Sequence, residues 1–526
     1  MALCANIQGV RRNCYLRAVV MSPEASDRTG IAAVPRRPAH LRVPPGLVLR
    51  LSPQVRVWAS GDVLIGGAPW RISRLSAPVA DLIRRMREVG PKGVAVVSAR
   101  DKAAARGLLD RGFAEPVPGE SDGPPRTSPS KAQVVIPVYQ DAEHLSSLLA
   151  SLRATRPGPA AATPALVIDD ASPDQHAIDQ TASAYGARLI RHAVNQGPAG
   201  ARNTGMAESD EPFIAFVDAD CLVDADWPDA LLHHFDDPAV AAVAPRVLPT
   251  VSGKGVLARY EAARSSLDMG RRAGLVRPGA RLGFVPSAAL VVRRAAVVPS
   301  GFDPDLRLGE DVDLIWRLAD AGWLVRYDPG IIVRHHSRLR LRPWLLRKIQ
   351  YGTSAADLEA RHPGRLAPAR VSLASLTALG LIAIGYPLAS PIPLIGNYVA
   401  LSRQLNAVPR SRLLAARTVA LGLVADTQSI GRVLRREWWP LGAVAIAASP
   451  RSRIARTVTA VMLAPLIAEW LDTRPGMDPV RFAAMRLIDD AAYGSGVLKS
   501  CIRARTWRPL MPVVHLPSRK SGPRRT

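Results

Sequence analysis

Two aspartates separated by one residue, Asp218 and Asp220, follow a short apolar run in this chain of 526 residues. The run, 214–217, is typical of a buried strand, so both carboxylates would stand at the mouth of a sheet, where open α/β sheets bind ligands. Carboxylates this close repel each other unless a cation lies between them. A divalent ion that is shared with substrate phosphates, Mg²⁺ or Mn²⁺, would fill that role. The alternative is a polar turn after a core strand.

A second acidic pair, Glu310 and Asp311, opens a segment that we expect to be helical through residue 318. The helix dipole favours an ionised carboxylate at this end, and an ionised carboxylate can accept a proton. The pair is therefore a candidate general base for the proton of an attacking hydroxyl group. The alternative is an ordinary acidic first turn of a helix.

The elements that would position these acids alternate between strand and helix, which predicts α/β architecture with a mostly parallel sheet. Strands are expected at 133–138, 165–168, 188–191 and 214–217, and helices at about 143–153, 176–185 and 201–208, the last after a glycine-bearing loop at 195–200. Three of the strands run into Tyr139, Asp170 and Asp218. Polar side chains should therefore converge at one edge of the sheet.

Taken together, the residues at this edge suit a nucleotide sugar. Pro137 would turn the chain so that the Tyr139 ring lies beside a base, and Asp170 would accept a hydrogen bond from a uracil N–H. Arg202 would lie near a diphosphate, because a guanidinium group matches phosphate geometry. Asp220, with the other aspartate of its pair, would hold a metal that stabilises the departing nucleotide.

Six short segments occur in a fixed order in the middle of the chain: PVY, DDAS, NQGPAGARNTG, DAD, GFD and GEDVDLIWR. The ordered set resembles the family 2 glycosyltransferases, which have a GT-A fold, and the resemblance covers residues 131 to about 340. It implies an inverting displacement at the anomeric carbon of the donor sugar. The processive synthases of this family carry a QxxRW motif after the base helix; this sequence lacks it, so processive synthesis is not expected.

The resemblance also assigns roles to individual residues. Asp311 matches the catalytic base and Glu310 its acidic neighbour, while Asp220 matches the metal-binding aspartate. Arg202 and Asn203 match the Arg-Asn pair of the family and are assigned to donor binding. The remaining donor-binding candidates are Pro137, Tyr139, Asp170 and Asp218.

Two consecutive histidines, His335 and His336, stand where the QxxRW motif would be expected. Some GT-A enzymes use a late histidine as a metal ligand, which makes His335 the candidate. The alternative is that one histidine packs in the core and the other hydrogen-bonds phosphate or backbone. A basic run around them either closes over the diphosphate or faces anionic lipid or solvent: Arg334, Arg338, Arg340, Arg342, Arg347 and Lys348.

Composition divides the chain into six parts. We expect a disordered basic N-terminus at 1–44, a winged-helix-like recognition module at 45–117, a Pro/Gly/Ser-rich linker at 118–131, the GT-A domain at 132–345, a membrane-associated helical region at 346–502 and a disordered basic tail at 503–526. The uncharged stretch 371–402 is long enough to cross a bilayer, although its three prolines equally suit a helical hairpin. The alternative is a soluble helical domain.

The net charge of +25 calls for an anionic partner. Only 5% of residues are aromatic and none interleave with the basic runs, so nucleic-acid binding is not expected. An anionic membrane fits better, and we expect the protein at the cytoplasmic face of the cell membrane. The four cysteines are far apart and the first 20 residues lack a signal-peptide pattern, so neither a disulfide framework nor export is expected.

The N-terminal stretch GLVLRLSPQVRVWASGDVLIGGAPWRISRLSAPVADLI, with PVYQD and VRHHSR, resembles the glycosyltransferases of the mycofactocin system. This resemblance implies a UDP-glucose-like donor and a peptide-derived redox cofactor as the acceptor. One alternative is a glycosyltransferase that acts on a lipid or a cell-envelope glycan. Another is an inactive GT-A domain that serves as a binding protein, although all the expected carboxylates are present.

Overall fold

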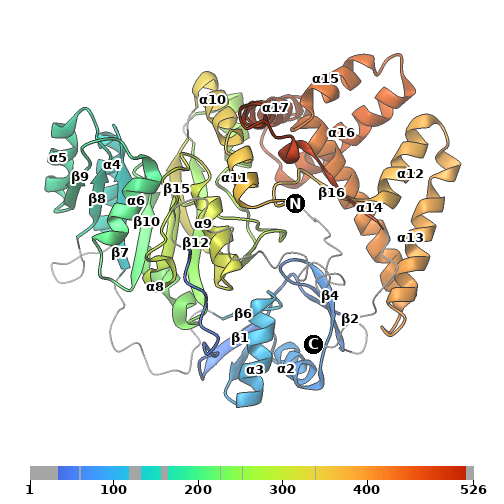
Figure 1. The fold of residues 1–526 in the computed structure, drawn as a ribbon, viewed down its shortest axis with the longest axis horizontal. Coiled ribbons are helices and arrows are strands. Elements are labelled where there is room, and N and C mark those ends of the chain that lie inside the picture. The colour runs from blue at the N-terminus through green and yellow to red at the C-terminus, as the bar shows by residue number, and fades with distance from the viewer. Residues whose placement is uncertain are drawn as a thin grey trace.

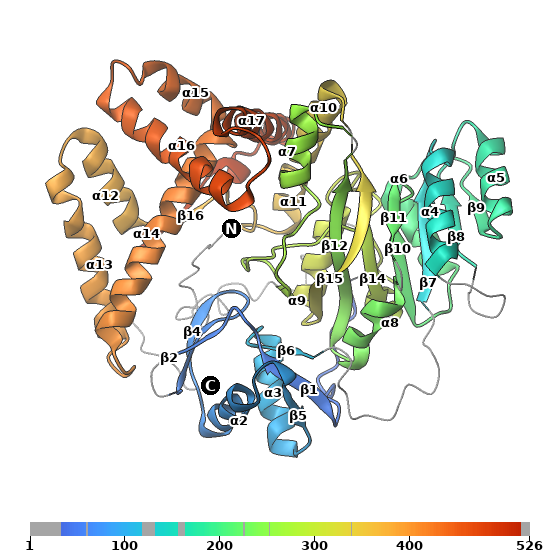
Figure 2. The same cartoon turned by 180° about the vertical axis from the view of Figure 1, so that it is seen from behind.

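The computed structural model describes residues 33–58, 61–117, 132–155, 164–224, 227–251, 253–337 and 339–516. Three regions are visible: a small N-terminal module, a domain built on a large sheet, and a C-terminal set of helices (Figures 1 and 2). The module contacts both of the others. The predicted linker 118–131 lies outside the described residues, as do 1–32 and 517–526 of the predicted disordered ends.

The large sheet has nine strands in the order β11-β15-β12-β14-β10-β7-β8-β9, and β13 pairs with β15. The neighbours β10, β7, β8 and β9 are parallel, as the alternating pattern predicted, whereas β14 is antiparallel to both β10 and β12. The strands are β7 (Ala132–Val138), β8 (Leu166–Asp169), β9 (Arg188–Arg191), β10 (Phe213–Val217), β11 (Cys221–Val223), β12 (Val240–Thr250), β13 (Gly274–Val276), β14 (Ala289–Arg293) and β15 (Leu324–His336).

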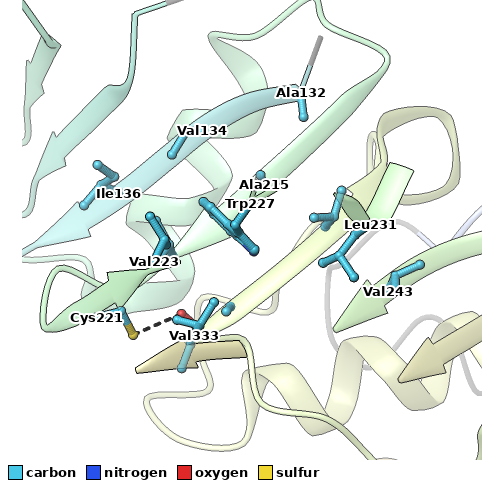
Figure 3. Packing of buried hydrophobic residues seen from close by; sticks show 14 of the residues in the cluster. Ala132, Val134, Ile136, Ala215, Cys221, Val223, Trp227, Leu231, Val243 and Val333 are labelled. Carbon is cyan, nitrogen blue, oxygen red and sulfur yellow. Dashed lines mark hydrogen bonds between the residues drawn. The ribbon is translucent and has the colours of Figure 1, made fainter. Parts of the chain in front are cut away.

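Helices and apolar side chains cover both faces of this sheet. The elements concerned are α4 (Ala142–Thr155), α5 (Gln175–Ala184), α6 (Gly197–Ala207), η4 (Asp229–Asp236), α7 (Val256–Arg264), α8 (Arg294–Val297) and α9 (Glu310–Asp320). Alternate residues of each central strand enter two separate cores, so Val134 and Ala215 lie in one and Val135 and Ile214 in the other. Figure 3 shows the first core, where Trp227 packs beside β7, β10 and β11.

Helix α6 begins four residues earlier than the sequence predicted. Gly197 takes a left-handed φ of 81°, and Pro198 occupies the first turn, where its missing N–H is not needed. The carboxylate of Asp170 accepts hydrogen bonds from the backbone N–H groups of Gln196 and Gly197 at 2.8 and 2.7 Å. Part of the predicted glycine loop is therefore the first turn of a helix.

The N-terminal module contains the predicted strands and two helices, with two further short strands. It consists of β1 (Leu47–Leu51), β2 (Arg56–Trp58), β3 (Val63–Gly66), β4 (Arg71–Arg74), α2 (Ala77–Val89), η3 (Gly90–Lys92), β5 (Val94–Val96), α3 (Ala99–Asp110) and β6 (Ala114–Pro116). β2, β3 and β4 form one antiparallel sheet, and β1 lies between β5 and β6 in another. β5 and β6 have three residues each, too few to show an alternating pattern in the sequence.

Residues 33–44 were predicted to be disordered, and the structure corrects this. The indole N–H of Trp323 donates to the carbonyl of Pro35 at 2.7 Å, and the backbone N–H of Arg37 donates to Ala321 at 2.9 Å. The Arg37 guanidinium also pairs with Asp110 of the module at 2.8 Å. This segment therefore ties the module to the end of α9, which a reading of composition alone does not reveal.

The C-terminal region is helical: α10 (Leu341–Gly352), α11 (Ala355–Arg361), α12 (Leu373–Ile384), η5 (Pro387–Ala389), α13 (Pro391–Gln404), α14 (Ser411–Arg435), α15 (Trp439–Ala448), α16 (Arg453–Thr473), α17 (Pro479–Arg503) and η6 (Arg508–Leu510). The stretch 371–402 takes its hairpin form, because its prolines separate α12 from α13. Within the described residues, one helix is long and apolar enough to cross a membrane, and it is α16.

The tail was expected to be disordered from residue 503, and this too is corrected for its first part. β17 (Val513–His515) pairs in parallel with β16 (Arg370–Ser372). The indole N–H of Trp438 donates to the carbonyl of Leu510 at 2.9 Å. These contacts hold the chain against the helical region up to the end of the described residues.

Candidate active site

The predicted acidic residues meet at one edge of the sheet because the strands that carry them point the same way. β7, β8 and β10 are parallel neighbours, and β12 and β15 share their direction through the intervening antiparallel strand β14. Tyr139, Asp170 and Asp218 therefore follow the carboxyl ends of three strands, and His335 lies at the carboxyl end of a fourth. We refer to this edge as the rim.

Arg202 joins the two acidic motifs at the rim. From α6, its Nη2 donates to Asp218 Oδ1 at 2.6 Å and its Nη1 donates to Glu310 Oε1 at 2.9 Å. Its guanidinium carbon lies 5.5 Å from the centre of the Phe302 ring. Arg202 is only 3% exposed, so both ion pairs are largely shielded from water. The residue was predicted to bind the diphosphate, but here it holds two carboxylates at a fixed spacing.

The charges of this cluster are strongly coupled. Burial opposes the charge on Arg202, but the carboxylates of Asp218 and Glu310 outweigh it and raise the pKa of the guanidinium above its usual value. Burial and then the charge of Asp311 raise the pKa of Glu310 to about 7, although Arg202 acts in the opposite direction. Near neutral pH the Glu310–Asp311 pair is therefore close to gaining or losing a proton.

Asp311 is the more accessible member of the pair. Its Oδ1 accepts a hydrogen bond from the N–H of Val312 at 2.7 Å, and its Oδ2 accepts one from the N–H of Ser287 at 3.2 Å. Burial is the largest influence and raises its pKa, against the hydrogen bonds and Arg202. A partly exposed carboxylate with a raised pKa at the N-terminus of α9 suits a general base, whereas the buried Glu310 lies behind Arg202.

Asp220 and His335 also come together, as the metal-binding hypothesis requires. His335 Nε2 lies 3.2 Å from Asp220 Oδ2, and the backbone N–H of His336 donates to the carbonyl of Asp220 at 2.9 Å. Burial lowers the pKa of His335, but the hydrogen bond to Asp220 and the charges of Asp220 and Asp218 outweigh it and raise the pKa overall. A carboxylate oxygen and an imidazole nitrogen at this spacing are a chemically suitable start for a divalent metal site.

The structure gives Asp170 a structural task besides its predicted one. Its carboxylate is 4% exposed and accepts the two α6 hydrogen bonds, and His192 Nδ1 lies 2.8 Å from its Oδ1. Its contact with a uracil ring stays a prediction. Tyr139, by contrast, is 48% exposed beside it and can present its ring to a base, and the half-buried Pro137 pairs with Ile168 of β8.

Asn203 forms its side-chain hydrogen bonds with the turn before α9. Its side-chain amide donates to the carbonyl of Phe302 at 2.8 Å, and its Oδ1 accepts from the N–H of the same residue at 2.8 Å. This reciprocal pair holds the Gly301-Phe302 turn against α6. Asn203 therefore positions the segment that precedes the base helix, which is a different role from the predicted donor contact.

Several residues near the rim were not identified as site residues from the sequence. His192 joins Asp170 to the Thr204 hydroxyl, each at 2.8 Å, and Arg307 donates to Asn195 Oδ1 at 2.8 Å. No spacing signal points to either of them. Arg347 of α10 was noted only within a basic run. Burial lowers its pKa, but Tyr351 together with Asp218 and Asp220 raises it overall, so its charge is felt at the rim.

One group of possible metal ligands lies elsewhere. Ligand atoms of His233, His234 and Asp328 are within 4.8 Å of one another, on η4 and β15. His234 Nε2 lies 2.8 Å from Asp328 Oδ2, and burial lowers the pKa of His234 to about 4. The neutral imidazole and the carboxylate thus form a buried pair at a distance from the rim.

Comparison with known proteins agrees with this geometry. Residues 133–297 match the model of a family described as glycosyl transferase family 2. The chain is also 36% identical over 488 residues to the pre-mycofactocin glycosyltransferase of Mycobacterium tuberculosis, covering 90% of this chain and 99% of that protein. The chain belongs to the family 2 glycosyltransferases. The glycosyltransferase therefore has the predicted GT-A domain, followed by a helical region that contains one apolar helix of spanning length.

More distant relatives share only parts of the glycosyltransferase. The glycosyltransferase AglE of Haloferax volcanii is 28% identical over 210 residues, 39% of this chain and 66% of that protein. Among solved structures, the mannosyltransferase PcManGT from Pyrobaculum calidifontis in complex with GDP-Man and Mn²⁺ is 18% identical with a TM-score of 0.40, covering 72% of this chain and 90% of that one. TarS residues 1–349 of S. aureus with UDP-GlcNAc is 16% identical with a TM-score of 0.36, covering 63% and 90%.

Proposed function

We propose that this glycosyltransferase moves a sugar, with glucose as the first candidate, from a UDP-sugar to a peptide-derived redox cofactor of the mycofactocin type. The transfer inverts the anomeric carbon and uses Mg²⁺ or Mn²⁺. The observation that carries the proposal is Arg202, which brings Asp218 and Glu310 to one place beside Asp311. The acceptor is proposed from the similarity to the pre-mycofactocin glycosyltransferase, which extends over almost the whole of that protein.

In the proposed reaction, the Asp311 carboxylate takes the proton of the acceptor hydroxyl group. The oxygen of that hydroxyl then forms a bond to the anomeric carbon as the bond to the nucleotide diphosphate breaks. Asp220 and His335 would hold the metal, and a metal bound there supplies positive charge that stabilises the departing diphosphate. Arg202 keeps the two acidic motifs in register, and Tyr139 presents its exposed ring to the base.

The test combines purified protein and metal with different sugar nucleotides and a peptide-derived acceptor. The masses of the products are then measured by mass spectrometry. We expect the acceptor to gain hexose mass with UDP-glucose and the nucleotide to be released in equal amount. Nucleotide release without any gain in acceptor mass would reject the acceptor. The absence of both with every donor would favour a binding protein that has lost activity.

A lipid or cell-envelope glycan is the second candidate acceptor, and the exposed apolar residues of the C-terminal helices support it. Leu388 between α12 and α13 is 95% exposed, and Ile392 of α13 is 67% exposed. A matched assay with polyprenyl phosphate in place of the peptide-derived acceptor separates the two candidates, since only one should accept the labelled sugar.

The proposal includes a location at the cytoplasmic face of an anionic membrane. The helical hairpins carry exposed apolar side chains, with Arg451 and Arg453 at the start of α16, an arrangement that suits attachment to anionic lipid. The length and hydropathy of α16 are compatible with deeper insertion. Cells can be lysed gently at low and at high salt, and the protein measured in the soluble and membrane fractions. If the protein is soluble at high salt and is also missing from the membrane fraction at low salt, this location is contradicted.

A further inference from the structure

A cavity lies between the N-terminal module and the catalytic domain, away from the rim. Its walls come from β1, α3 and β6 on one side and from η4, β13 and β15 on the other, and they surround a cavity of about 70 Å³ that is partly open to solvent. Arg50 and Glu115 of the module and His234, Arg326 and Asp328 of the catalytic domain contribute the charged and titratable groups. The cavity therefore contains charged groups within a partly apolar lining and lies where two regions meet.

The arginines around this junction outnumber the carboxylates that pair with them. Both terminal nitrogens of Arg37 donate to Asp110, at 2.8 and 2.9 Å, and the Arg50 Nε donates to Glu115 at 2.9 Å. Those two ion pairs use one carboxylate each.

A third arginine, Arg106, pairs with a further acid of the junction, Asp237. It donates to both oxygens of Asp237, at 2.8 and 3.1 Å, and its Nε donates to Asp110 at 2.9 Å. Arg326 is the fourth arginine. Among the residues that the structure describes, its Nε and Nη2 have no hydrogen-bond partner.

Arg326 is 6% exposed, so its two N–H groups without partners cannot be satisfied by bulk water. Burial lowers the pKa of its guanidinium, in spite of the nearby carboxylates of Asp237 and Glu115. A buried charge without an acceptor is costly, and a bound counter-ion removes that cost.

We propose that this cavity binds a small oxyanion, a carboxylate or a phosphate group, through the Arg326 guanidinium. A guanidinium fork pairs with either group through two parallel hydrogen bonds. The bound group would supply the acceptor that the wall lacks and would link β15 of the catalytic domain to β1 and β6 of the module. The proposal does not depend on the sugar or the acceptor of the catalytic reaction.

The proposed site is separate from the donor site. Arg326 and His335 lie on the same strand, β15, and pair with Val243 and Pro249 of β12. Those partners are six residues apart, a span of about 20 Å in extended chain. A ligand in the cavity therefore cannot be the diphosphate of a donor bound at the rim. Saturation of the rim with UDP and Mg²⁺ should leave binding in the cavity unchanged.

The experiment is isothermal titration of the full chain with succinate and, separately, with inorganic phosphate, in the presence of saturating UDP and Mg²⁺ and at constant ionic strength set with chloride. We expect saturable binding of at least one of the two oxyanions at one site per chain. Arg326→Lys should keep the charge but lose the fork, and should weaken binding at least tenfold. Arg326→Met should abolish it.

Arg294→Met is the matched control, because Arg294 also has a buried Nε without a partner but does not line this cavity. We expect it to bind the oxyanion as the unchanged protein does. Binding that survives both Arg326 variants would place the anion elsewhere and overturn the proposal. Binding of neither oxyanion to the unchanged protein would also overturn it. Arg326→Lys keeps the test decisive if Arg326→Met does not fold.

Discussion

At the scale of single residues, the site depends on how one buried arginine is used. Arg202 binds the carboxylate of Asp218, after β10, and that of Glu310, at the start of α9, so its charge is compensated inside the protein. This leaves Asp311 and Asp220 on the two sides of the cluster, one suited to a proton and the other to a cation. Removal of Arg202 would leave the two carboxylates without their shared counter-ion, which is strongly destabilising.

The raised pKa of Glu310, about 7 compared with an ordinary value of 4.5, predicts a pH dependence. A proton held by the Glu310–Asp311 pair reduces the negative charge available to the base, so kcat should fall as the pH drops below about 7. Glu310→Gln should move this acidic limb to lower pH, because Asp311 then ionises beside a neutral amide. Initial rates between pH 5 and 9 measure the effect.

The same shift has a consequence for stability. The folded protein holds the Glu310 proton more tightly than the unfolded chain, so this group's contribution to stability is complete below about pH 4.5 and is lost as the pH rises through about 7. Denaturation at several pH values should show this loss in the unchanged protein and not in Glu310→Gln. If the acidic limb of the kcat profile stays near pH 7 in Glu310→Gln, the titration belongs to another group.

The metal hypothesis makes a prediction about Asp220. Chelation with EDTA should abolish transfer, and Mg²⁺ or Mn²⁺ should restore it. Asp220→Asn should raise the metal concentration for half-maximal activity by at least about tenfold, because one of the proposed ligands loses its charge. Asp224→Asn is the control: this exposed carboxylate pairs with Arg334 at 3.3 Å on the surface. Equal metal requirements in the two variants would remove Asp220 from the metal site.

At the scale of elements, α6 connects the predicted donor motifs. Its first turn binds Asp170, its middle carries Arg202, and Asn203 holds the turn before α9. The helix can lie this close to β7 because Gly205 has no side chain. A Cβ at Gly205 would come 2.2 Å from Val135 Cγ1, which is closer than any real contact. The position of Arg202 therefore depends on a glycine one turn away.

Gly205→Ala should accordingly destabilise the protein by about 1–3 kcal/mol, the usual cost of overpacking a core. It should also lower kcat, because α6 moves away from β7 and takes Arg202 with it. Gly422→Ala is a matched change inside another helix, where no heavy atom lies within 4 Å of the new methyl group. Higher helix propensity should leave that variant unchanged or stabilise it by up to about 1 kcal/mol. Denaturant titration compares the two, and equal stabilities would contradict the packing explanation.

The sequence predicted the elements of the catalytic domain better than the contacts between them. Apolar runs that lead into an aromatic residue or an acid revealed β7, β8, β10 and the rim, because strand patterning and motif order are local properties. The partners of Arg202 and Asn203 are 16 to 108 residues away along the chain, so no local pattern could identify them. The start of α6 was misplaced for the same reason. The carboxylate that accepts hydrogen bonds from the backbone at this start belongs to Asp170, which follows β8.

The C-terminal region shows a similar limit. The longest uncharged stretch, 371–402, was a candidate for either a membrane span or a helical hairpin, and its prolines divide it into α12 and α13. The helix of spanning length, α16, contains Arg453 and Arg456 at its start and Glu469 near its end, so charges hid it from a search for uncharged runs. Which stretch forms a helix of spanning length therefore depends on where helices end, and helix ends depend on capping and packing.

At the scale of the whole molecule, the N-terminal module connects the other two regions. Trp58 of β2 donates its indole N–H to the carbonyl of Pro409 at 2.9 Å, and Val63 of β3 packs in one core with Leu401 and Leu414. On its other side, the module reaches the catalytic domain through Arg106 and Asp237. Figures 1 and 2 show it below both regions. The predicted recognition module is therefore an integral part of the structure.

The proposed membrane attachment concerns the whole molecule and can be measured with vesicles. We expect the protein to sediment with vesicles that contain anionic lipid and to be released by salt. Leu388→Ser with Ile392→Ser should reduce the bound fraction at least tenfold, since each apolar side chain contributes about 1.5–3 kcal/mol when buried. Val480→Ser removes a residue of α17 that is 76% exposed and should have little effect. Equal loss in both variants would contradict attachment through the α12–α13 hairpin.

The most direct test of the shared rim is the comparison of turnover and nucleotide affinity in Asp311→Asn. The amide cannot accept the proton of the acceptor, so we predict that kcat falls by at least about 100-fold, while the Kd for UDP with metal stays within about twofold. Asp305→Asn, an exposed change in the loop before α9, should leave both unchanged. Turnover retained in Asp311→Asn would contradict the assignment of the base and, with it, the catalytic role of the rim.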